Sequence, residues 1–130
     1  MKRLLFAALM MVCSVSWAKW KFLEKGDDFS VYIDKSTITR KGEIAKIWVL
    51  IDYFEEKTSY GKKFKSVIFR DAYNCVEELA TLAGSAKYSG VMGTGKVVES
   101  YAKKENEQEW ELVLPGSNGE KMLKMLCGKK

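Results

Sequence analysis

Histidine is absent from all 130 residues of the chain. Because histidine is the commonest general base and a frequent metal ligand, its absence argues against most acid–base and zinc sites. The sequence also lacks any C-x-x-C pair and any G-x-S-x-G element. Two acidic pairs, Asp27-Asp28 and Glu55-Glu56, lie in short polar segments without further ligands at the spacing of a calcium loop. We therefore expect a non-enzymatic protein with no metal ion and no cofactor.

Long apolar runs are also scarce, since only residues 4–15 form one. Two basic residues precede this run, and small residues follow it at the positions that signal peptidase reads. This order is typical of a secretory signal peptide over residues 1–18, cut between Ala18 and Lys19. A retained membrane anchor is a weaker alternative, because twelve apolar residues span about 18 Å as a helix and the hydrocarbon core is roughly 30 Å thick.

Removal of the signal peptide leaves residues 19–130, which we expect to form one domain without a transmembrane segment. The signal contains two of the 22 Lys and Arg and none of the 17 Asp and Glu, which leaves a charge of +3. This mild surplus does not indicate nucleic-acid binding. A lipid anchor on Cys13 is disfavoured, because Val12 precedes it where a lipoprotein has a small residue.

Cysteine is rare, and after cleavage only Cys75 and Cys127 are left. Two cysteines in an exported protein most simply form one disulfide, and two buried free thiols are the alternative. The bridge would close a loop of about 53 residues, which is worth roughly 4 kcal/mol by loss of chain entropy in the unfolded state.

The remaining residues are dominated by strand patterns. Apolar alternation and β-branched or aromatic residues predict strands over 29–34, 44–54 and 64–74 and shorter extended segments over 20–23, 96–101 and 111–114. Residues 55–63 are polar and contain a glycine, so we expect a hairpin loop there. Residues 76–88 fit a strand and a helix equally well.

A helix is predicted at the C-terminus. Ser117 and Glu120 fit the S-x-x-E capping box, apolar residues follow at helical spacing, and Gly128 is a typical stop. The predicted fold class is therefore α+β: an antiparallel sheet of about six strands, with a C-terminal helix tied to it by the Cys75–Cys127 disulfide.

One stretch, GVMGTGKV at residues 90–97, is close to the nucleotide-binding pattern G-x-x-x-x-G-K-[ST]. Val97 replaces the hydroxyl residue that would coordinate magnesium, and the β-branched run after it favours a strand where a phosphate site needs a helix. We interpret the glycines as a tight turn or bulge before a strand.

Two possible surface sites have simpler interpretations. Three tryptophans, Trp20, Trp48 and Trp110, could form an aromatic platform, but core or sheet-face packing is the favoured interpretation. Lysines could likewise form a basic surface, but scattered solubilising charge is favoured; they are Lys62, Lys63, Lys65, Lys103, Lys104, Lys129 and Lys130.

Several short motifs occur in a distinctive order. They are VYID at 31–34, STI at 36–38, WVLIDY at 48–53, Ser66, YNC at 73–75, MGTGKVV at 92–98, Trp110, PGS at 115–117, Glu120 and Cys127. This order resembles the surface-adhesin protein E family of Gram-negative bacteria over nearly all of residues 19–130. The resemblance implies an antiparallel sheet with a disulfide-held helix, and a protein that binds host extracellular-matrix and plasma proteins and can dimerise.

The prediction from the sequence is therefore an exported envelope protein, in the periplasm or at the cell surface of a Gram-negative bacterium. It would act as an adhesin-like module that binds extracellular or envelope macromolecules, and no partner-binding residue is identified. The alternative is a periplasmic carrier that holds a small apolar ligand between the sheet and the helix residues Met122 and Met125.

Overall fold

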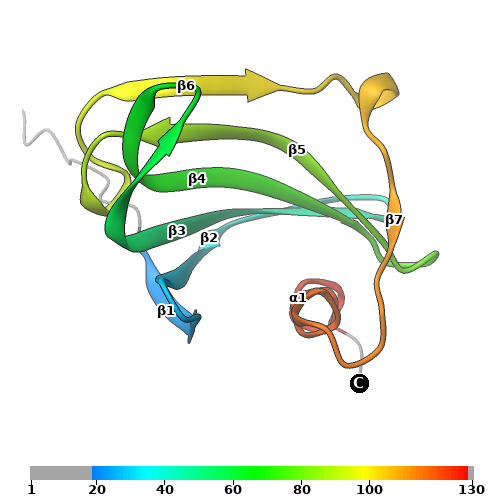
Figure 1. Ribbon diagram of the computed structural model, residues 1–130. Helices are drawn as coiled ribbons and strands as arrows, with labels where there is room; N and C mark the ends of the chain where they lie inside the picture. Colours follow the sequence, from blue (N-terminus) through cyan, green and yellow to red (C-terminus); the bar gives the residue numbers. More distant parts are fainter. Residues whose placement is uncertain (1–18, 129–130) are drawn as a thin grey trace, which may run out of the picture.

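The computed structural model describes residues 19–128. The predicted signal peptide, with Cys13 and Ala18, lies outside the described residues, as do Lys129 and Lys130. Within the described range, seven strands form one antiparallel sheet and a single α-helix follows them (Figure 1). The strands are β1 (Lys21–Lys25), β2 (Phe29–Lys41), β3 (Ile44–Ser59), β4 (Lys62–Asn74), β5 (Leu79–Tyr88), β6 (Val97–Ala102) and β7 (Glu111–Leu112). The helices are α1 (Asn118–Cys127) and two 3-10 turns, η1 (Val91–Gly93) and η2 (Glu105–Glu107).

The sheet is a meander, in which strands β1 to β6 pair in chain order. The short β7 pairs with the beginning of β5, and β6 pairs with the remainder of the same edge of β5. The predicted α+β class and antiparallel sheet are confirmed, with seven strands in place of about six.

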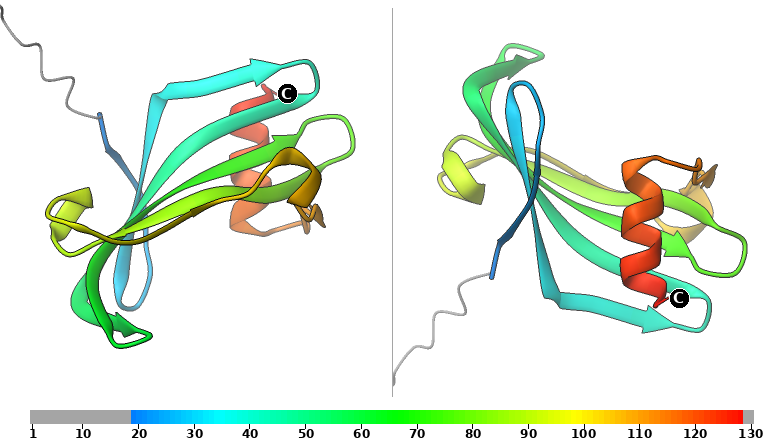
Figure 2. Two further views of the ribbon diagram at one scale, coloured as in Figure 1. Left: turned by 90° about the horizontal axis from the view of Figure 1, so that it is seen from above. Right: turned by 90° about the horizontal axis from the view of Figure 1, so that it is seen from below.

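Helix α1 covers one face of the sheet only. Viewed from below the helix lies in front of the strands, and viewed from above it lies behind them (Figure 2). Its buried residues Met122, Leu123 and Leu126 pack against alternate residues of the strands, including Ile33 and Ile47. Because successive side chains of a strand point to opposite faces, the residues between them are presented on the face without a helix.

The helix begins and ends where the sequence predicts. The Ser117 side chain accepts a hydrogen bond from the Glu120 amide at 3.3 Å. Gly128 closes the helix in the left-handed conformation, with φ 62°. Both are local signals that satisfy the free backbone groups at a helix end, which explains why the sequence sufficed to place it.

The disulfide joins Cys127 at the end of α1 to Cys75, directly after β4, with a Cα–Cα distance of 5.6 Å. Cys75 is almost fully buried within the core cluster under the helix. The predicted link between helix and sheet is therefore confirmed.

The predicted hairpin loop over residues 55–63 is much shorter in the structure. Strand β3 continues to Ser59 and β4 starts at Lys62, so only Tyr60 and Gly61 form the turn. Both have positive φ, 49° and 74°, which suits a two-residue hairpin. The prediction of a long loop was wrong because it took the polar residues as evidence of a loop. Exposed strand residues at the end of a hairpin can equally be polar.

Residues 76–88, for which the sequence allowed a strand or a helix, form a tight turn followed by the strand β5. Backbone pairing with β4 extends from Asn74 opposite Leu79 to Ser66 opposite Tyr88. This long-range pairing decides against the helix, which the local pattern allowed equally well.

Candidate functional site

A groove crosses the helix-free face of the sheet. It consists of two hollows of about 430 Å³ and about 450 Å³, which share Lys46, Arg70 and Glu105 as lining residues. We call the continuous hollow the basic groove. Its wall and floor come from β2, β3, β4, β5, β6 and the segment around η2.

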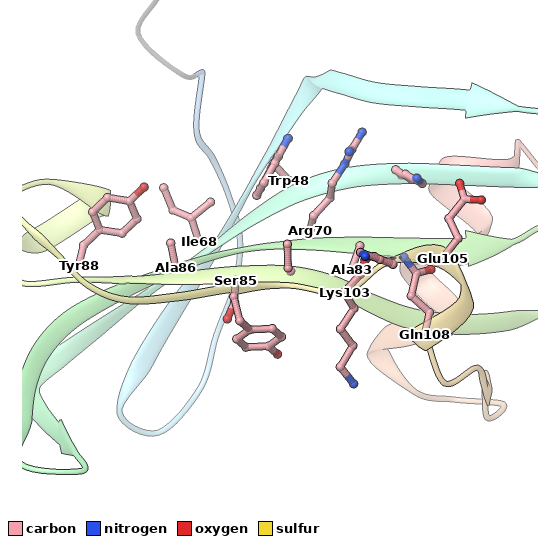
Figure 3. A pocket seen from close by; sticks show the side chains of 15 residues that line it. Trp48, Ile68, Arg70, Ala83, Ser85, Ala86, Tyr88, Lys103, Glu105 and Gln108 are labelled. Carbon is pink, nitrogen blue, oxygen red and sulfur yellow. Dashed lines mark hydrogen bonds between the residues drawn. The ribbon is translucent and has the colours of Figure 1, made fainter.

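The groove exists because side chains of different size lie side by side on neighbouring strands. Strand β5 contributes only small residues to its floor between positions 83 and 86. The large side chains of Trp48 on β3 and Arg70 on β4 lie beside these small residues, as Figure 3 shows. Tyr101 of β6 lines the far side. The size difference leaves a hollow on the sheet surface.

Gly84 allows the two strands at this edge to come close together. A Cβ atom at this position would lie 3.0 Å from the Tyr101 carbonyl oxygen and 3.4 Å from the Cα of Ala102. A larger residue at position 84 would push β6 away from β5. The glycine therefore sets the spacing of these two strands at the outer edge of the groove.

The lining is strongly positive. Six cationic residues and one acidic residue line the two hollows. The cationic residues are Arg40, Lys41, Lys46, Arg70, Lys103 and Lys104. Arg40 lies opposite the core residue Ala45 in the β2–β3 pair, so its side chain is directed to the helix face. The whole chain has 22 Lys and Arg and 17 Asp and Glu, so 16 of each sign lie elsewhere. Two of those 16 cations belong to the predicted signal peptide, so without it the rest of the chain has 14 cations and 16 acids, and the lining residues carry more than the whole surplus of +3.

None of these six cations forms an ion pair with an acidic side chain in the part of the chain that the structure describes. The Arg70 guanidinium lies over the Trp48 ring, with 5.6 Å from Cζ to the ring centroid. Its Nη2 has one long contact, 3.5 Å to the Thr39 hydroxyl, and its buried Nε has no hydrogen-bond partner among residues 19–128. A buried donor without a partner costs about 1–3 kcal/mol, which an anionic ligand could offset.

The glycine-rich stretch at 90–97 lies on the same face, at the end of the groove that Ile68 lines. The amides of Met92 and Gly93 donate to Asp52 Oδ1 at 3.1 Å and to Ser66 Oγ at 2.8 Å. Strand β6 follows, as the sequence predicts. These two amides are thus used within the protein, which agrees with the interpretation of the stretch as a scaffold turn.

A smaller hollow of about 240 Å³ lies on the opposite face, between the sheet and the start of α1. Its lining includes Phe69, Asp71 and Met122. This volume is below the roughly 300 Å³ at which ligand pockets begin, and Met122 belongs to the buried core. Met125 packs against the same core. These observations favour core packing over a carrier site.

Burial raises the pKa of the Asp71 carboxyl to about 6, although a hydrogen bond from the Tyr73 hydroxyl at 3.4 Å opposes the shift. Burial also raises the pKa of the Tyr73 phenol, with a smaller contribution from Asp71. The pair lies in the small hollow and does not border the basic groove.

Metal ligation and membrane crossing by a helix find no support in the described part of the chain. No group of three or more His, Cys, Asp or Glu is arranged to hold a metal ion within residues 19–128. No helix in the same range is long and apolar enough to cross a membrane.

The sequence pointed to some of the groove residues, but core or sheet-face packing and scattered charge were the favoured interpretations. Trp48 and the pair Lys103-Lys104 line it, and Trp110 lines an adjoining hollow. Lys63 and Lys65, by contrast, lie on the distal hairpin, where Lys63 pairs with Glu56 and Lys65 donates to the Tyr53 carbonyl.

The sequence analysis missed Arg70, Lys46 and Arg40, which the structure brings together with Lys103 and Lys104. Lys46 and Arg70 are isolated basic residues within strands, and Arg40 is followed by Lys41 at the end of β2. The available signal was their position in the alternation, which places Lys46 and Trp48 on the same face of β3.

The fold and the groove together define an α+β protein in which a disulfide-bound helix covers one face of a meander sheet and leaves a cationic groove on the other. A family model described as Surface-adhesin protein E matches residues 20–128, so the chain belongs to the surface-adhesin protein E family. Its membership makes the chain an adhesin-like protein of the bacterial envelope or surface.

Solved structures of Haemophilus influenzae protein E have the same fold. One is 17% identical with a TM-score of 0.63 and covers 86% of each chain. Another, from non-typeable Haemophilus influenzae, is 16% identical with a TM-score of 0.61 and covers 82% of this chain and 75% of the other. No curated protein matches the chain. At these identities the likeness shows the fold alone.

Proposed function

We propose that the protein is exported by cleavage between Ala18 and Lys19, and that residues 19–130 act as a non-enzymatic adhesin-like module. The module binds a macromolecular partner in the periplasm or at the cell surface through the basic groove. The observation that carries the proposal is the set of six cations without ion-pair partners among the described residues. The dimer that the family resemblance implies stays a prediction.

Physical reasons support the groove as the binding surface. Like charges gathered on one face repel one another, and an oppositely charged partner would relieve that repulsion. Arginine and tryptophan are enriched among the residues that contribute most to interface affinity, and here the two side chains pack on each other. The open shape of the groove admits a segment of a macromolecule and is not restricted to a small molecule.

The test is a binding screen of the exported protein against immobilised extracellular-matrix and envelope proteins. The variant Arg70→Ala/Lys46→Ala should lose at least about tenfold in affinity for any partner that binds the groove, since it removes an anchor and a second cation that lines both hollows. Surface plasmon resonance at two salt concentrations would measure the loss and its salt dependence.

The matched control is Lys62→Ala/Lys63→Ala, which removes two charges from the distal hairpin. This variant should bind as the wild type does. Equal effects of the two variants would show that only net charge matters, and the groove would have to be abandoned as the site. Absence of binding to every matrix and envelope protein would contradict the proposed function itself.

A further inference from the structure

The lining of the basic groove combines two kinds of surface that one ligand must match. The floor is apolar, with Ile68, Ala83 and Ala86 among the lining residues beside Trp48. Lys46 and Arg70 line both hollows beside this floor, and Glu105 is the sole acid among the lining residues. A ligand that fits must therefore carry both negative charge and apolar groups.

Arg70 is the group at the centre of the groove best suited to a carboxylate. It lines both hollows, and its guanidinium rises beside Trp48 (Figure 3). A guanidinium presents a planar fork of donors that pairs with a carboxylate through two parallel hydrogen bonds. In residues 19–128 the only acceptor for this fork is the Thr39 hydroxyl, at 3.5 Å.

The cations follow a line across the strands. Lys41 ends β2, Lys46 lies on β3, Arg70 lies on β4, and the pair at 103–104 follows β6. Neighbouring strands are about 4.8 Å apart, so β2 to β6 span about 19 Å. An extended peptide covers that distance with about six residues at roughly 3.3 Å each.

We propose that the basic groove binds an extended acidic segment of a partner protein, about six residues long. One carboxylate of the segment pairs with Arg70, other carboxylates lie near the flanking lysines, and an apolar side chain lies on the floor beside Trp48. A sulfated polysaccharide matches the cations but leaves the apolar floor without a partner, and charge complementarity together with this floor favours the peptide. This inference depends on the proposed function and names the chemical class of the partner.

The test uses an array of ten-residue peptides in which acidic and apolar positions are varied independently. Peptides with both Glu or Asp and Leu or Phe should bind the exported protein. Replacement of every Glu by Gln should weaken binding at least about tenfold, and so should replacement of the apolar residues by Ser. Arg70→Lys should also bind at least about tenfold more weakly, because lysine keeps the charge but lacks the fork.

Controls and contrary outcomes separate this inference from the proposed function. Lys62→Ala/Lys63→Ala should bind the peptides as the wild type does, and thermal melting of Arg70→Lys checks that the variant is folded. A heparin oligosaccharide that binds the groove while acidic peptides do not would overturn the inference. The inference also fails if matrix or envelope proteins need Arg70 but no acidic peptide binds, and in that case the proposed function stands.

Discussion

At the scale of single residues, side chains with similar sequence context have very different environments. Asp71 and Arg70 are neighbours on β4, yet their side chains are on opposite faces of the sheet. Arg70 borders the basic groove, whereas Asp71 lies among apolar residues near the start of α1. The alternation of the strand thus separates a residue of the proposed binding surface from one that affects stability.

The variant Asp71→Asn should stabilise the protein at neutral and alkaline pH. The pKa of Asp71 is raised from 3.8 to about 6, so the folded state holds a proton that the unfolded state releases between these values. The contribution of Asp71 to stability is therefore most favourable below about pH 4 and is lost as the pH rises through 6. Asparagine removes this penalty, which is on the order of 2–3 kcal/mol at pH 8.

Urea unfolding at pH 4, 6 and 8 measures the effect. The gain of Asp71→Asn over the wild type should be near zero at pH 4 and largest at pH 8. Asp27→Asn is the control, because it removes the same charge from an exposed turn. A gain for Asp71→Asn that does not change with pH would contradict the explanation by burial.

At the scale of elements, the glycine-rich segment around η1 packs against the helix-free face of the sheet. Gly93 has φ 71°, and a Cβ atom there would lie 2.6 Å from Cδ1 of Ile68 and 3.2 Å from Cδ1 of Leu50. Leu50 is fully buried on the helix-free face. The segment therefore covers the apolar end of this face, while the end with the basic groove is left open.

Gly93→Ala should destabilise the protein by about 2–4 kcal/mol, from positive-φ strain of roughly 1 kcal/mol and overpacking against Ile68 and Leu50. Gly42→Ala is a matched control, because Gly42 has φ 58° and nothing lies within 4 Å of its Cβ position. The control should lose only about 1 kcal/mol. Equal losses in chemical denaturation would show that the segment does not pack on the sheet as described.

At the scale of the whole molecule, one covalent bond holds the two layers together. The helix has ten residues, which is too short to be stable by itself in water, so it depends on its packing and on the disulfide. The bridge joins residues 52 positions apart in sequence. Removal of the bridge should therefore lower the free energy of unfolding of the whole protein.

Replacement of both cysteines, Cys75→Ser/Cys127→Ser, should lower the free energy of unfolding by about 4 kcal/mol, because the unfolded chain regains the entropy of a long loop. Denaturation of both proteins measures the difference. Intact-mass analysis of the exported wild type should find residues 19–130 with two hydrogens missing. A mass that includes acyl chains on Cys13, or no missing hydrogens, would contradict the predicted processing or the bridge.

The sequence by itself determined the features that depend on neighbouring residues. The capping box and the glycine stop fixed α1, and the small number of cysteines left one obvious pair. The alternation located the long strands, but β2 and β3 continue to Lys41 and Ser59, beyond the predicted ends at 34 and 54. Helix ends and strand faces follow from backbone groups and side chains a few positions apart, which is why these predictions were confirmed.

Only the tertiary structure decided the rest. Pairing with β4 selected a strand over a helix for residues 79–88, and the meander brought Lys41, Lys46 and Arg70 to one hollow. Both results depend on contacts between residues distant in sequence. Local patterns cannot rank such contacts, because the energies that decide them arise only when the strands lie side by side.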